Sequence, residues 1–205
     1  MIGLNDVDLQ EFKRVANAKE QYEGVVTLDF KRALSAMCKL ATGVASLHAT
    51  GTYHGELTDM IVLMADDGMD GGLKPVMFSQ GLSSVLPPTL EHVCAVREDY
   101  ILFFAPERCP TTMDATLSAP TAEADMWSFG VLLIFITLLS LPMVQVTTFE
   151  ILDIALKGNT ATQILEIDSI DSPQAYKDIA RQCLQTDPAA RPTSAHVAAA
   201  LAKLL

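Results

Sequence analysis

The segment from Met126 to Val146 contains no charged residue and reads MWSFGVLLIFITLLSLPMVQV. A run of this length either spans a bilayer or forms a helix that is buried on every side in a protein core. Its flanks carry the acidic residues Asp125 and Glu150 instead of the lysines and arginines that anchor transmembrane helices. Small polar residues and Pro142 also interrupt it. We therefore expect the central helix of a soluble domain, ended by Pro142, and no membrane association.

Apolar periodicity predicts further helices on both sides of this run. In residues 28–47, apolar side chains recur every three or four positions, with Thr27 as the expected N-cap and Gly51 as the stop. Three later helices are expected at 149–156, at 173–184 with Ser172 as N-cap and Pro173 in the first turn, and from Ser194 to the end.

Two short apolar runs, Ile61–Met64 and Val76–Phe78, flank an Asp- and Gly-rich segment and predict a β-hairpin. The glycines between them do not fit the G-x-G-x-x-G pattern of a phosphate-binding loop. Residues 79–120 are poorly periodic and rich in proline, which is typical of a long loop. The order of elements predicts a mainly α fold, with residues 1–205 forming a single domain around the apolar helix.

The charge and the cysteines exclude several classes of function. A net charge of -11 without a basic run argues against nucleic acid and anionic membrane surfaces as partners. The four cysteines are scattered and match no metal-binding spacing, so no metal site is expected. The N-terminus lacks the pattern of a signal peptide. We expect free thiols and a cytoplasmic location.

Several segments, in order along the chain, resemble the C-terminal lobe of a eukaryotic protein kinase. YHGELTDMIVL resembles the catalytic loop H-R-D-L-K-x-x-N-I-L, VMFSQGLSS resembles the strand and turn that carry D-F-G, and FFAPE resembles the A-P-E motif. ADMWSFGVLL resembles the start of the central helix, and CLQTDPAARPT resembles the stretch before the last helix. The resemblance covers nearly the whole chain. It implies a helical C-lobe with a small hairpin and an activation-segment-like loop. The opening DVDLQEF resembles the helix just after the interlobe hinge, so we expect the N-lobe to be absent.

The resemblance assigns fold-holding roles to several residues. Glu107, in the motif Ala105-Pro106-Glu107, would form a buried ion pair with Arg191. This pair would join the activation segment to the final helices.

Three further residues would support the catalytic loop and the lobe around it. Asp125 would cap the backbone of the loop from the start of the central helix. His54 would pack under the turn at Gly81, and Trp127 would pack within the lobe.

The catalytic loop departs from the family pattern. Gly55 stands where the family has Arg, and Thr58 replaces the loop lysine. Glu56 stands in place of the catalytic Asp, and its additional methylene displaces the carboxylate by about 1 Å, which matters for an aligned attack.

The metal positions depart further. Ile61 replaces the Asn that holds the second magnesium, and Ser79-Gln80-Gly81 replaces D-F-G, so the principal magnesium carboxylate is missing. We expect no cofactor, and ATP and magnesium only if the chain is active.

These departures favour a catalytically inactive pseudokinase that acts as a protein-interaction or regulatory scaffold. The alternative is a fragment of a serine/threonine or tyrosine kinase that needs a missing N-lobe and uses Glu56 as its base. A decayed remnant without a selected role is a third reading. The partner would be another protein or a second copy of the chain. It would bind an open apolar face that includes Leu57, the two strands and the turn at 79–81.

Overall fold

The computed structural model describes residues 29–59, 62–66, 73–77, 89, 98–110, 112, 114–138 and 165–205. Within these residues the fold is mainly helical and contains a two-stranded sheet, as the sequence predicts. The elements are α2 (Phe30–Ala49), β1 (Val62–Asp66), β2 (Leu73–Met77), η3 (Glu98–Phe103), η4 (Pro106–Arg108), α4 (Ala122–Leu138), η5 (Ile167–Ser169), α7 (Gln174–Cys183), η6 (Pro188–Ala190) and α8 (Ser194–Ala202). The helix expected at 149–156 and the stop at Pro142 lie outside the described residues.

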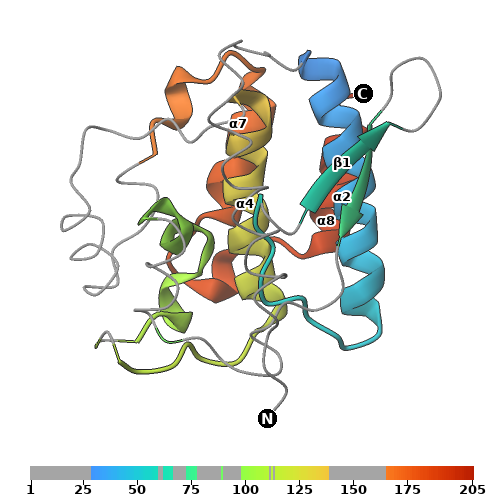
Figure 1. Ribbon diagram of the computed structural model, residues 1–205. Coiled ribbons are helices and arrows are strands. Elements are labelled where there is room, and N and C mark those ends of the chain that lie inside the picture. Colours follow the sequence, from blue (N-terminus) through green and yellow to red (C-terminus); the bar gives the residue numbers. More distant parts are fainter. Residues whose placement is uncertain are drawn as a thin grey trace, which may run out of the picture.

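Helix α4 contains the first part of the uncharged run and is the centre of the fold (Figure 1). Every residue from Ala124 to Ile134 is buried, which explains why the helix shows no polar face. It packs closely on α7, since a Cβ added at Gly130 would lie 2.8 Å from the Cβ of Cys183. Of the helices that the structure describes, none is both long enough and apolar enough to cross a membrane.

Helix α2 buries one face against α8, α4 and the hairpin. It begins at Phe30 with Asp29 at the N-cap position, so the predicted cap at Thr27 is wrong. It ends where the sequence predicts. The N–H of Gly51 donates to the carbonyl of His48 at 2.9 Å, and Gly51 has a φ of 72°, which glycine adopts without strain.

The hairpin is antiparallel, with a register that pairs Val62 with Met77 and Asp66 with Leu73. Its strands are displaced from the predicted ones because pairing extends toward the turn on both sides. Figure 1 shows the hairpin beside α2, which β2 contacts. Val62 is 6 % exposed, whereas Val76 is 39 % exposed. Only part of this element therefore faces outward.

The interpretation of residues 79–120 as one long loop needs correction where the structure describes them. Two 3₁₀ helices, η3 and η4, lie within this range. Residues 100–105 are all buried, because the apolar sequence YILFFA packs against the central helix. Helical periodicity could not find this segment, since it is too short to repeat.

Pro173 and Thr193 occupy the N-cap positions of the last two helices. Pro173 is the N-cap of α7, so the predicted cap at Ser172 and the placement of Pro173 in the first turn are wrong. The Ser172 hydroxyl is buried and has no hydrogen-bond partner among the described residues. Helix α8 begins at Ser194 as predicted, and the Thr193 hydroxyl accepts the N–H of His196 at 3.2 Å.

Candidate functional site

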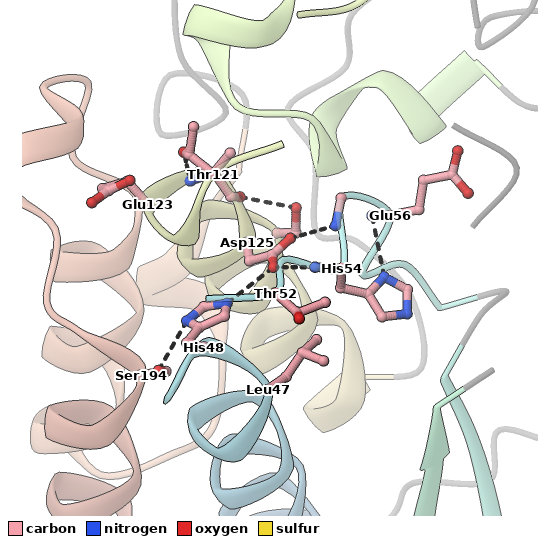
Figure 2. A network of polar contacts seen from close by, with 12 residues as sticks. Leu47, His48, Thr52, His54, Glu56, Thr121, Glu123, Asp125 and Ser194 are labelled. Carbon is pink, nitrogen blue, oxygen red and sulfur yellow. Dashed lines mark hydrogen bonds and ion pairs between the residues drawn. The ribbon is translucent and has the colours of Figure 1, made fainter. Parts of the chain in front are cut away.

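Asp125, in the first turn of α4, holds the loop that resembles a kinase catalytic loop (Figure 2). Its Oδ1 accepts the backbone N–H of Gly55 at 2.7 Å, and its Oδ2 accepts that of His54 at 2.7 Å. Asp125 is fully buried, so both hydrogen bonds to the charged carboxylate are shielded from water. The structure thus brings Asp125 and the loop together in the way that the resemblance implies.

His48 extends this network, and sequence reasoning missed it. Its Nε2 lies 3.0 Å from Oδ2 of Asp125, and its Nδ1 lies 3.0 Å from the hydroxyl of Ser194 (Figure 2). The order Ser-His-Asp is also that of a nucleophilic triad. Here Ser194 is only 4 % exposed and the carboxylate already accepts two backbone N–H groups. The cluster therefore joins α2, α4 and α8 structurally. The signal available in the sequence was that His48 is a polar residue near the end of an amphipathic helix.

The loop has an unusual backbone conformation at Gly55, and Glu56 within it is buried. Gly55 has a φ of 81°, a left-handed conformation that costs any other residue strain. The N–H of Glu56 donates to Nδ1 of His54 at 3.2 Å, and Thr58 lies 3.4 Å from the hydroxyl of Tyr100. Glu56 is 8 % exposed, and its side chain points away from Asp125 (Figure 2). The candidate base is thus separate from the carboxylate that supports the loop.

The metal positions fall outside the part of the chain that the structure describes. Ile61, Ser79, Gln80 and Gly81 are among the residues without a described placement, and so is the predicted packing of His54 under Gly81. Among the described residues, no group of three or more His, Cys, Asp or Glu side chains is arranged to hold a metal ion.

Arg191 and Glu107 form a two-pronged ion pair. The Nη1–Oε1 distance is 2.6 Å and the Nη2–Oε2 distance is 2.8 Å. The Arg191 side chain is fully buried, whereas that of Glu107 is 30 % exposed, so the pair is less buried than the sequence predicts. The remaining guanidinium donors reach backbone carbonyls, and the guanidinium carbon lies 5.1 Å from the centre of the Trp127 ring. These carbonyls belong to Gln185, Glu123 and Thr186.

Trp127 anchors the segment that precedes this pair. It is 1 % exposed, and its Nε1–H donates to the carbonyl of Leu102 at 2.9 Å. The neighbouring Ser128 hydroxyl donates to the carbonyl of Phe103 at 2.6 Å. Ala105 and Pro106 follow directly and lead into η4. The central helix thus holds the residues just before the A-P-E segment through its own side chains.

Arg108, next to the A-P-E residues, is a second buried arginine that the sequence pattern did not single out. It donates through Nη1 to the carbonyl of Gly55 and through Nε to that of Ser118 at 2.9 Å. Burial lowers its pKa, although the nearby carboxylates of Asp125 and Glu56 act in the opposite direction. The loop is therefore held from two sides, by an anion and by a cation.

Comparison with known proteins agrees with this geometry. Residues 8–201 match the family described as "Protein kinase domain". The chain belongs to this family.

Several kinases are similar in sequence. The chain is 26 % identical over 199 residues to Germinal center kinase 3 of Caenorhabditis elegans, covering 93 % of this chain and 32 % of that protein. It is 30 % identical over 169 residues to the phosphorylase b kinase gamma catalytic chain, liver/testis isoform, of Mus musculus, covering 82 % and 39 %. Calcium-dependent protein kinase 1 of Oryza sativa subsp. japonica is also 30 % identical over 169 residues, covering 82 % and 30 %. The chain spans about a third of the length of these relatives.

Proposed function

We propose that this chain is a pseudokinase, a kinase-like helical lobe that does not transfer phosphate and acts as a protein-interaction or regulatory scaffold. The observation that carries the proposal is a contrast within one site. The fold-holding contacts are present, since Asp125 holds the loop and Arg191 pairs with Glu107. The residues at the reacting and metal positions are not those that the chemistry requires.

The metal positions support this proposal through the chemistry of their side chains. Phosphoryl transfer relies on magnesium that bridges the phosphates, and magnesium favours carboxylate and other oxygen ligands in octahedral geometry. Ile61 offers no side-chain oxygen, and Ser79 offers only a neutral hydroxyl. We therefore propose that the chain uses neither ATP nor magnesium as a cofactor.

A second candidate function rests on Glu56. It places a carboxylate at the position of the catalytic base, so the second candidate is a serine/threonine or tyrosine kinase activity. Against this, Glu56 is 8 % exposed in the described structure. Its longer side chain also displaces the carboxylate from the position that an Asp would give.

Nucleotide binding separates these two functions. We expect the melting temperature of the purified chain to be unchanged by millimolar ATP with magnesium, because no carboxylate positions the metal. A shift that requires magnesium and disappears when EDTA is added would favour the kinase reading.

The partner and the location are part of the same proposal. We propose binding to another protein or to a second copy of the chain, in the cytoplasm. Cys38 and Cys183 are free thiols, which fits a reducing compartment. The apolar face proposed for this binding is smaller than the sequence predicts, because Leu57 is fully buried. Val76 leaves an exposed apolar side chain on the hairpin.

Light scattering tests the self-association arm of this proposal. A mass above that of one chain, reduced to one chain by Val76→Lys, would support pairing through the hairpin. Lys74, which is also exposed on β2, provides the matched control Lys74→Gln. A monomer at all concentrations would exclude a second copy of the chain as the partner and leave another protein as the proposed partner.

A further inference from the structure

Arg108 joins two segments that lie far apart in the sequence. Its Nη1 donates to the carbonyl of Gly55, in the loop 52–58, and its Nε donates to the carbonyl of Ser118 at 2.9 Å. The guanidinium carbon lies 5.5 Å from the centre of the Phe104 ring. The residue is 4 % exposed, so these contacts form in a shielded environment.

The backbone closes the same junction. The N–H of Ser118 donates to the carbonyl of Arg108 at 3.0 Å, in addition to the side-chain bond in the opposite direction. Arg108 and Ser118 are therefore tied to each other twice. Through Nη1, Arg108 also attaches this pair of residues to the loop 52–58.

Gly55 provides the space that Pro120 occupies beside the guanidinium. A Cβ at position 55 would lie 2.9 Å from the Cβ of Pro120 and 3.7 Å from Nη1 of Arg108. The φ of 81° also disfavours any side chain there. The absent side chain thus lets Pro120 and the loop pack closely at the same junction.

The charges around the guanidinium stabilise it in place. Burial lowers the pKa of Arg108, and Asp125 and Glu56 counter this only in part, but a guanidinium remains charged inside proteins. Replacing the side chain would remove two charged donors and deprive the carbonyl of the buried Gly55 of its hydrogen bond.

We propose that Arg108 is an internal latch that holds Ser118 and the loop 52–58 together. The acceptors that the described residues provide for its guanidinium are the carbonyls of Gly55 and Ser118. Opening the latch releases Ser118 and the loop at Gly55 together. The proposal is independent of whether the chain transfers phosphate.

Hydrogen exchange of the full chain tests the latch directly. In Arg108→Gln, we expect exchange about tenfold or more faster in peptides that cover 53–58 and 114–120, because both segments lose a charged donor. Peptides from α8 should be unchanged. Arg181→Gln is the matched control, since this arginine is 33 % exposed and pairs with Asp168 on the surface. It should leave both segments unchanged.

A second variant acts on the same junction from the other side. Gly55→Ala keeps the guanidinium but places a Cβ against Pro120, so it should accelerate exchange in both segments as well. Gly55→Ala provides the test of the proposal if Arg108→Gln does not fold. Acceleration of one segment alone would overturn the proposal, because the two would not be coupled. Unchanged exchange in both segments, or equal acceleration that includes α8, would also overturn it.

Discussion

All five guanidinium N–H groups of Arg191 donate hydrogen bonds, and two of them donate to Glu107, which lies 84 positions earlier in the chain. The two partners are unequally buried, since the arginine side chain is fully buried and that of the glutamate is 30 % exposed. Removing either partner therefore has a different consequence.

Arg191→Leu should destabilise the protein by about 3–5 kcal/mol, because a buried charge pair is broken and backbone carbonyls lose their donors. Glu107→Gln should cost less, about 1–3 kcal/mol, because one amide oxygen still accepts a hydrogen bond and the position reaches water, although the amide nitrogen then faces a guanidinium N–H of the buried Arg191. Urea unfolding followed by circular dichroism measures both. The exposed Arg181→Leu should stay within about 0.5 kcal/mol. A larger effect for Glu107→Gln than for Arg191→Leu would contradict this account of the pair.

Asp125→Asn should cost about 3 kcal/mol, since it removes a charged acceptor from two backbone N–H groups and turns one oxygen into a donor that faces an N–H. The loss should be accompanied by faster hydrogen exchange at Gly55. Asp168→Asn is the matched control, because that side chain is 85 % exposed. Equal stabilities of the two variants would show that Asp125 does not support the loop.

The buried thiol of Cys183 predicts that the protein loses stability at high pH. Burial raises the pKa of its thiol from 9.0 to about 12, so the folded protein keeps a proton that the unfolded chain releases. The contribution is complete below pH 9 and is lost as the pH rises toward 12. In Cys183→Ala, the free energy of unfolding should fall less steeply over this range, by up to about 1.4 kcal/mol per pH unit. Unfolding in urea at several pH values between 8 and 11 measures the slope. Identical slopes in the two proteins would exclude this role.

The sequence predicts the helices and the hairpin because their apolar patterns repeat over many residues. Their ends are less predictable, since Thr27 and Ser172 have the right chemistry for caps but lie outside the N-cap positions that the backbone uses. Leu57 was expected on an open face and is fully buried, because local sequence does not show which neighbours cover a loop residue.

For the site, the motif order points to Asp125, Glu107 and Arg191, whose contacts the structure describes. Arg108 and His48 could not be found in this way. Their partners lie 53 and 77 positions away in the chain, and no local pattern marks a residue that becomes buried through such distant contacts.

Incubation of the purified chain with radiolabelled ATP, magnesium or manganese, and a generic protein acceptor tests the central claim most directly. The account predicts incorporation no higher than in a reaction without the chain, because Ile61 and Ser79 cannot supply the metal ligands that phosphoryl transfer needs. Glu56→Gln should give the same background. Clear incorporation by the unmodified chain that disappears in Glu56→Gln would contradict the account and make Glu56 a working base.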